Sequence, residues 1–198
     1  MKTIHRPIRT ALAILAIAAV PVGAVAAPKL AGAVSPATSG APTAAAACPA
    51  GWGSLPKANN RYSMAQLTGI RAGRHACFDR LVVDLAGRPV GYDVRYVRAV
   101  YTEGAGDLVP LRGGAKLQII VRAPAYGRDY EPTYDPANPR EVVKVTGYRT
   151  FRQVAFAGSF EGQTTIGLGV RARLPFRVLT LTGPGTSSRI VVDVAHSW

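Results

Sequence analysis

Apolar and polar residues alternate along much of the chain beyond residue 75. In the segment Arg80–Leu85, positions 81, 83 and 85 are apolar and face one side of an extended backbone, while Arg80 and Asp84 face the other. A period of two, or a short continuous apolar run, predicts further strands at Val94–Val100, Leu108–Leu111, Leu117–Val121, Val142–Thr146, Val154–Phe156, Thr164–Val170, Phe176–Leu181 and Arg189–Ala195. Eight or nine strands separated by Gly and Pro turns predict an all-β fold, either a sandwich or a barrel.

Helical spacing is weak outside the N-terminal region. We expect one short helix at Arg61–Leu67. Gly104–Asp107 has the composition of a turn, across which Leu108–Leu111 pairs back with the preceding strand.

Two of the predicted strands carry nearly the same hexapeptide. Arg80–Leu85 and Arg189–Val194 share four of six residues, and both differences are conservative. One interpretation is chance in a β-rich composition. The other is a pair of equivalent strands, whose outward Arg and Asp side chains pair across neighbouring strands and discourage edge-to-edge aggregation.

The first 26 residues resemble a secretory signal peptide. Met1–Arg9 carries three cations and no acid, the apolar run Ala11–Val20 follows, and Ala24–Ala26 supplies the small residues of a cleavage site. The apolar run is too short to span about 30 Å of hydrocarbon. We predict cleavage after Ala26 and no membrane span thereafter; a later cut at Ala33 and an uncleaved anchor are the alternatives.

Residues 27–47 are predicted to form a linker. Within 28–47, 17 of 20 residues are Ala, Gly, Pro, Ser or Thr, so this stretch has too little apolar area to order itself. One interpretation is that this linker holds the folded part away from a membrane or cell wall. The other is a pro-segment or a low-complexity stretch with no role. Residues 48–198 then form one domain, long enough to bury a substantial core.

Positive charge dominates this domain. It holds 20 Lys and Arg against 11 Asp and Glu, and 17 of the 20 are Arg. Arginine suits carboxylate and phosphate partners, which favours an anionic envelope polymer or a lipid surface. GC-rich codon usage is the alternative cause. Nucleic acid is not expected, because the arginines are dispersed and no recognition motif is present.

Cys48 and Cys77 are the only cysteines. In an exported protein such a pair is oxidised, so we predict one disulfide that closes a loop of about 30 residues. A zinc site with His75 and His196 is the alternative, but the spacing matches no common zinc pattern. We expect no metal and no cofactor.

Several motifs together resemble the AMIN-like domain family. They are Cys77–Leu85, Gly91–Val97, Phe160–Thr164, Pro175–Val178 and Arg189–Val194, and the resemblance runs from about His75 to His196. The family occurs in secreted proteins of high-GC Gram-positive bacteria and is related to the AMIN domain of cell-wall amidases. The resemblance implies a β-sandwich of two small sheets and a targeting or wall-binding role without catalysis.

Catalytic patterns are sparse. Beyond the predicted signal peptide there are only two histidines, and Gly158–Gly162 lacks the G-x-S-x-G form of a nucleophile elbow. The acids Asp79, Asp84, Asp93, Asp193 and Glu161 could supply a glycosidase pair, yet solvated or ion-paired structural carboxylates are the simpler interpretation. Gly167–Ala172 imitates a dinucleotide motif without the following helix, so glycines that ease a strand bend explain it better.

The segment Ala123–Arg140 is the best candidate for a contact surface. Its candidate ligand-binding residues are Tyr126, Arg128, Tyr130, Tyr134 and Arg140. Tyrosines can stack on sugar faces while arginines pair with carboxylates or phosphates. Ordinary packing at the end of the sandwich is the alternative.

The sequence therefore predicts an exported, non-enzymatic module, secreted or associated with the cell wall, that binds a cell-envelope polymer such as peptidoglycan. An interaction module for another envelope protein is the first alternative, and a cryptic hydrolase is the second.

Overall fold

The computed structural model describes residue 48 and residues 50–198; the predicted signal peptide and linker lie outside the described residues. The described part contains eleven β-strands and no helix. The strands are β1 Lys57–Asn59, β2 Gln66–Arg74, β3 Phe78–Ala86, β4 Tyr92–Val97, β5 Val100–Tyr101, β6 Leu108–Val109, β7 Ala115–Val121, β8 Phe151–Phe160, β9 Gln163–Val170, β10 Phe176–Thr182 and β11 Ser188–Ala195.

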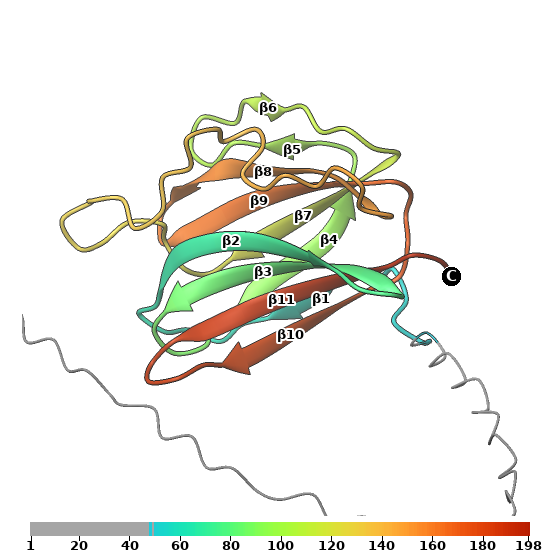
Figure 1. Ribbon diagram of the computed structural model, residues 1–198. Coiled ribbons are helices and arrows are strands. Elements are labelled where there is room, and N and C mark those ends of the chain that lie inside the picture. The colour runs from blue at the N-terminus through green and yellow to red at the C-terminus, as the bar shows by residue number, and fades with distance from the viewer. Residues whose placement is uncertain (1–47, 49) are drawn as a thin grey trace, which may run out of the picture. The chain divides into compact units, whose positions relative to one another are not determined.

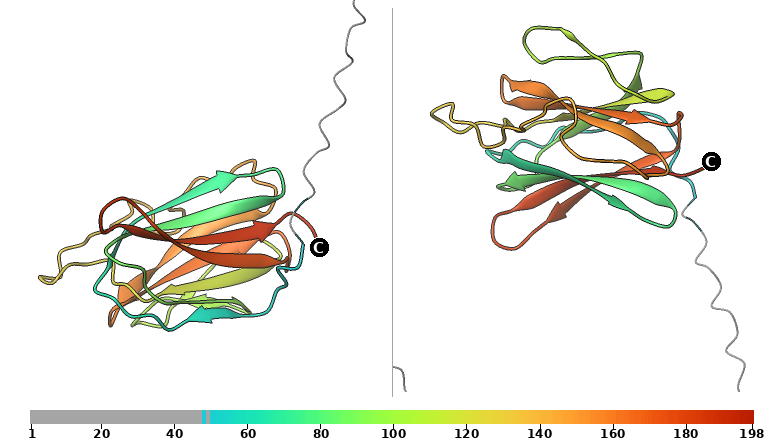
Figure 2. Two further views of the ribbon diagram at one scale, coloured as in Figure 1. Left: turned by 90° about the horizontal axis from the view of Figure 1, so that it is seen from below. Right: turned by 45° about the horizontal axis from the view of Figure 1, so that its top comes forward.

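These strands form two facing antiparallel sheets and one small hairpin (Figures 1 and 2). One sheet has the order β1-β4-β7-β9-β8, and the other has the order β10-β11-β3-β2. Fully buried side chains from both sheets make up the core between them, among them Leu81, Leu117, Ile166 and Val192. The all-β fold predicted from the alternating pattern is confirmed, and of the two alternatives the structure is the sandwich that the family resemblance implied.

The β5–β6 hairpin covers part of the outer face of the five-stranded sheet (Figure 1). A second apolar cluster forms there between Val100, Val109 and Leu111 and two alanines of β8. Glycines in β9 permit this close approach: a Cβ on Gly169 would lie 2.0 Å from the carbonyl oxygen of Arg112. Close approach of the covering segment, rather than a strand bend, therefore accounts for this glycine.

The two similar hexapeptides lie side by side in the four-stranded sheet. β3 and β11 pair antiparallel, so that Arg80 lies opposite Asp193 and Arg189 opposite Asp84. Both pairs are ion pairs, with Nε–Oδ1 distances of 2.6 Å and 3.4 Å respectively. The hypothesis that these Arg and Asp side chains pair across neighbouring strands is confirmed.

Two local predictions are wrong. Arg61–Leu67 is not helical: its first five residues are irregular, and β2 begins at Gln66. The apolar residues of this segment do not share a helical face: Ala65 and Leu67 are buried two residues apart, as in a strand, whereas Tyr62 and Met64 are exposed. Val142–Thr146 is a loop, not a strand, although Val145 is buried in the core.

Candidate functional site

The predicted disulfide is present. Cys48 and Cys77 are bonded, with their Cα atoms 5.3 Å apart. The bond holds the segment around Trp52 on the outer face of the four-stranded sheet, where its ring lies 5.5 Å from that of Phe78. The guanidinium of Arg177 lies over Trp52, 4.4 Å from the ring centroid. Since both cysteines are in the disulfide, the alternative zinc set has lost its thiolates.

The histidines have structural contacts. His75 stacks on Phe78 at 4.4 Å between ring centroids. His196 Nε2 lies 3.2 Å from Oδ1 of the fully buried Asp79, and Oδ2 of Asp79 accepts backbone N–H bonds from Thr150 (2.6 Å) and Phe151 (3.0 Å). Across residues 48 and 50–198, no group of three or more His, Cys, Asp or Glu side chains is placed to hold a metal ion.

Three of the remaining candidate carboxylates are in ion pairs with arginine. Asp84 binds Arg71, Asp93 binds Arg95, and Asp193 binds Arg80. Asp193 is fully buried, and Arg80 donates from Nε to Oδ1 and from Nη2 to Oδ2. This hydrogen bonding raises the pKa of Arg80 above its ordinary value, against an opposing contribution from burial.

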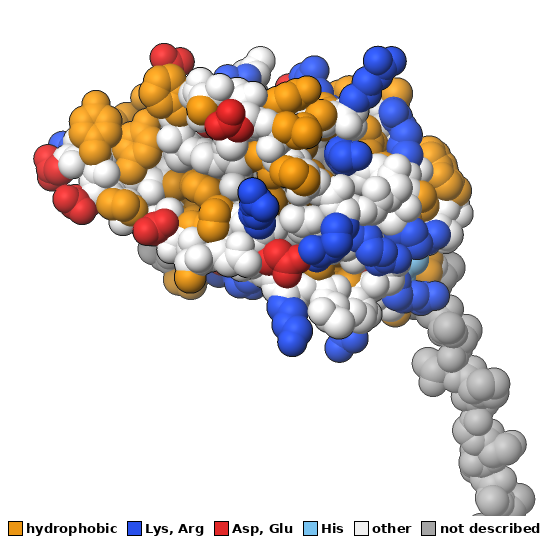
Figure 3. Space-filling model, turned by 90° about the horizontal axis from the view of Figure 1, so that it is seen from above, with side chains coloured by type: hydrophobic (Ala, Val, Ile, Leu, Met, Phe, Trp, Pro, Cys, Tyr) orange, Lys and Arg blue, Asp and Glu red, His pale blue; other side chains and the backbone are white. Residues whose placement is uncertain are grey.

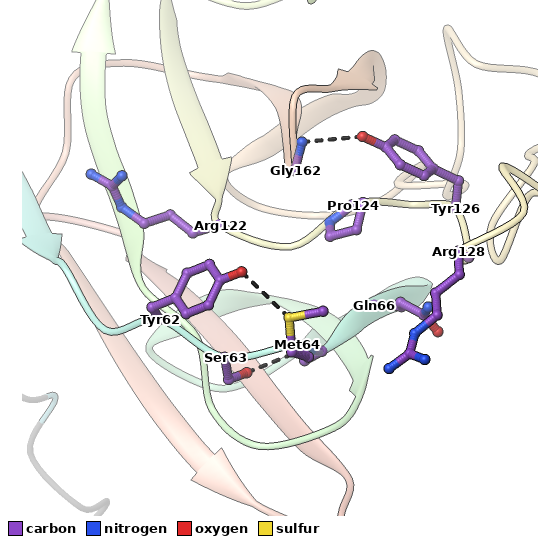
Figure 4. Close-up of a pocket in the computed structure, with 11 residues that line it drawn as sticks. Tyr62, Ser63, Met64, Gln66, Arg122, Pro124, Tyr126, Arg128 and Gly162 are labelled. Carbon is purple, nitrogen blue, oxygen red and sulfur yellow. Dashed lines mark hydrogen bonds between the residues drawn. The ribbon is translucent and has the colours of Figure 1, made fainter.

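A pocket of about 220 Å³ opens at the end of the sandwich where β7 ends, β2 begins and β8 turns into β9 (Figure 4). Its walls come from three segments distant in sequence: residues 62–66, residues 122–128 and Gly162. Tyr62 and Arg122 lie on one side in the close-up, and Tyr126 and Arg128 lie on the other. The lining is more apolar than polar.

Two predicted binding residues, Tyr126 and Arg128, line this pocket. The Tyr126 hydroxyl accepts a hydrogen bond from the backbone N–H of Gly162 (3.1 Å), which orients the ring (Figure 4). Tyr130 stacks on Tyr126 with ring centroids 5.7 Å apart and planes inclined by 24°. Tyr130 is 80% exposed, so the pair extends the pocket wall into solvent.

The other two predicted residues lie elsewhere. Tyr134 packs against the core with its ring edge toward Phe156, and burial raises the pKa of its hydroxyl. Packing therefore explains this tyrosine better than ligand contact. Arg140 lies beside a separate hollow near Pro110 and Gln153, where its carbonyl oxygen accepts a hydrogen bond from the Gln153 side chain.

Sequence reasoning missed Tyr62 and Met64, which line the opposite wall. They are 79% and 72% exposed, and the Tyr62 hydroxyl lies 3.3 Å from the Met64 sulfur. They were missed because a helix was expected at Arg61–Leu67. The sequence pattern that could have indicated them is a large aromatic residue and a Met two residues apart, directly before a strand that has its own apolar positions.

The sequence model of the AMIN-like domain matches residues 65–196. The chain belongs to the AMIN-like domain family. The match begins about ten residues earlier than the resemblance seen in the motifs, and so takes in β2. No curated protein and no solved structure matches the chain.

Membership in the AMIN-like family points to a cell-wall-related binding module, and the disulfide is consistent with an extracytoplasmic protein. A search of the described residues for a helix long and apolar enough to cross a membrane finds none.

Proposed function

We propose that this AMIN-like domain is a non-catalytic module that binds a cell-envelope glycan, such as peptidoglycan, at its tyrosine-bearing end. The observation that carries the proposal is the pocket between Tyr62 and Tyr126, which are held apart by different segments of the fold. Aromatic faces can receive the apolar face of a sugar ring, while polar groups at the rim take its hydroxyls.

The chemistry of the rim supports a wall polymer. Arg128 makes no ion pair with a carboxylate of the described residues, and it lines the pocket beside Gln66. A free guanidinium can pair with the carboxylates of peptidoglycan stem peptides. The volume of about 220 Å³ lies below the range of ~300–1,000 Å³ typical of small-molecule sites, so one ring would enter while the polymer continues over the surface.

Lack of catalysis is part of the proposal. Catalysis by a His-based or carboxylate pair requires groups that face a substrate cleft. Asp79 and Asp193 are fully buried and hydrogen-bonded, and His75 is stacked on Phe78. None of these three side chains lines the pocket at the tyrosine-bearing end.

A second candidate is a module that docks on another envelope protein. It is favoured by the exposure of Tyr62, Met64 and Tyr130 around one pocket, because exposed apolar groups gathered together often mark protein contacts.

Co-sedimentation with purified sacculi tests the proposal. The sacculi are first treated with protease and stripped of covalently attached phosphate polymers, so that only glycan and stem peptides remain. We expect the purified chain to sediment, and the Tyr62→Ala/Tyr126→Ala variant to bind at least tenfold more weakly. Tyr101→Ala is the matched control, because Tyr101 is an exposed tyrosine on β5 that does not line the pocket.

Failure of the unaltered chain to sediment at low salt would remove the proposal. Binding to untreated sacculi that disappears after protease treatment would favour the protein-docking alternative. Equal sedimentation of the double variant and the unaltered chain would exclude this pocket as the glycan site.

A further inference from the structure

Charged side chains are unevenly distributed along the sandwich. Acidic residues gather around the tyrosine-bearing end, where Asp129, Glu131 and Asp135 follow Tyr126 in the chain. In the face shown in Figure 3, acidic side chains (red) and hydrophobic side chains (orange) gather at the left end, and Lys and Arg side chains (blue) predominate toward the right end. We call the opposite end, where β2 and β9 end and β3 and β8 begin, the basic end.

Many cations at the basic end have no acidic partner. Arg112 pairs with Glu141, and Arg80 and Arg177 pair with Asp193. The others make no ion pair with a carboxylate of the described residues; they are Arg74, Arg98, Lys116, Arg149, Arg152, Arg171 and Arg173.

Three of these unpaired cations surround a pocket of about 330 Å³. Arg98 follows β4, Lys116 lies in β7 opposite Val97, and Arg173 lies in the loop between β9 and β10. The remaining lining residues are Tyr96, Val97, Gly114 and Ala115, so no acid lines the pocket. Gathering three like charges around one recess is unfavourable unless an anion enters it.

The pocket is built into the fold rather than left to mobile side chains. Arg173 donates from Nε to the Ser54 hydroxyl (3.2 Å) and from Nη2 to the Ser54 carbonyl oxygen (3.3 Å). Its guanidinium lies over the ring of Tyr96, 5.2 Å from the centroid. The Tyr96 hydroxyl in turn donates to the carbonyl oxygen of Leu174 (2.8 Å) and accepts its N–H (3.0 Å). One cation and one wall are therefore already in place before any ligand binds.

We propose that this pocket binds a phosphate group of an anionic phosphodiester polymer. A phosphodiester offers two charged oxygens to an arginine fork, as a carboxylate does, but its tetrahedral arrangement of four oxygens lets two arginines and a lysine approach it from different directions. A polymer is favoured over a single small anion because the unpaired Arg171 follows β9 beside Gly114 of the pocket, and Arg149 lies in the adjoining loop, where they can meet successive phosphates. This site lies at the opposite end from the tyrosine pocket and does not depend on the proposed glycan function.

The test measures binding of the purified chain to a synthetic oligo(glycerol phosphate) by titration calorimetry. The test variant is Arg98→Gln/Lys116→Gln, which leaves the structural contacts of Arg173 intact. The matched control is Arg61→Gln/Arg88→Gln, which removes the same charge from exposed arginines near the other end. We expect the test variant to bind at least tenfold more weakly and the control to bind within about twofold of the unaltered chain.

Several outcomes would overturn the proposal. No binding at low salt would do so, as would equal losses in both variants, which would mean a response to net charge alone. Equal affinity for polyglutamate of the same charge would replace the phosphate assignment with a general preference for polyanions. Binding to phosphatidylglycerol vesicles but not to the oligomer would mean a membrane surface. Melting temperatures of both variants distinguish lost binding from lost folding. Unchanged binding of the test variant to the stripped sacculi would show that the two sites are independent.

Discussion

Removal of the Asp79 carboxylate tests the packing of the sandwich most directly. Asp79 lies near the start of β3 and points inward, where it is fully buried. Its carboxylate accepts the backbone N–H groups of Thr150 and Phe151 and contacts the ring of His196. It therefore joins β3 to the start of β8 and to the end of the described chain. Asp79→Ala deletes all three contacts at once.

The expected loss follows from the two backbone N–H groups. Each buried donor left without a partner costs about 1–3 kcal/mol. Two such donors give a loss of about 2–6 kcal/mol in the free energy of unfolding, to be compared with a total of about 5–15 kcal/mol for an ordinary domain. Asp79→Asn keeps one acceptor oxygen, so its loss is expected to lie well below that of the alanine variant.

Urea denaturation followed by the fluorescence of Trp52 and Trp198 measures this loss. Asp84→Ala is the matched control on the same strand, because the Asp84 side chain is 30% exposed and its arginine partners are at the surface. Exposed ion pairs contribute about 0–1 kcal/mol, so the control should change little. An alanine variant at position 79 that is within about 1 kcal/mol of the unaltered chain, with the same denaturant slope, would refute the reasoning.

Three further predictions concern the disulfide, a strand glycine and a buried tyrosine. Reduction of the disulfide, whose cysteines are 29 residues apart, is expected to lower stability by about 3.5 kcal/mol, measured by urea denaturation with and without reductant. Gly169→Ala brings a Cβ against the Arg112 backbone and should destabilise by about 1–3 kcal/mol, whereas Gly69→Ala meets only ordinary contacts and should be nearly neutral by the same measurement. Burial raises the pKa of Tyr96 above its ordinary value of 10.0, so the folded state keeps the neutral hydroxyl at pH values where the unfolded chain ionises. The contribution of the Tyr96 hydroxyl to the free energy of unfolding is therefore fully present below pH 10, and it is lost as the pH rises through the raised pKa. Tyr96→Phe should flatten that alkaline decline in melting temperature, and an equally steep decline would contradict this assignment.

The fold was most predictable where every second residue of a strand lies in the core. This holds in β3 and β11, and their shared hexapeptide correctly indicated cross-strand pairs of Arg and Asp; the core residues are Leu81, Val83, Leu85, Ile190, Val192 and Val194. β2 was missed because its bulge interrupts the alternation at Thr68. Val142–Thr146 was mistaken for a strand because three of its five residues are valines, and a loop that packs on the core has the same composition as a short strand.

The candidate site was half predictable for a related reason. A Tyr- and Arg-bearing loop indicates a contact surface, and Tyr126 and Arg128 do line the pocket. Composition alone does not say which tyrosines of such a loop turn inward, and Tyr134 does. The facing wall with Tyr62 comes from a segment about 60 residues earlier, and only the pairing of the strands brings it there.

Codon usage need not be the sole cause of the high arginine content, because one group of arginines has a role in the fold and another group is left unpaired. Arg80 and Arg177 both bind the buried Asp193, and the two donors of Arg80 each meet a different carboxylate oxygen. A lysine ammonium cannot reproduce that fork, so this part of the positive charge is explained by folding. We expect an anionic partner to be recognised by the cations left unpaired, and half of those in the described residues are the seven named at the basic end. Arg80→Lys should therefore lower stability without weakening the oligo(glycerol phosphate) complex, whereas Arg98→Lys should leave stability unchanged. Loss of binding in Arg80→Lys at full folding would mean that the ion-paired arginines also contact the polymer.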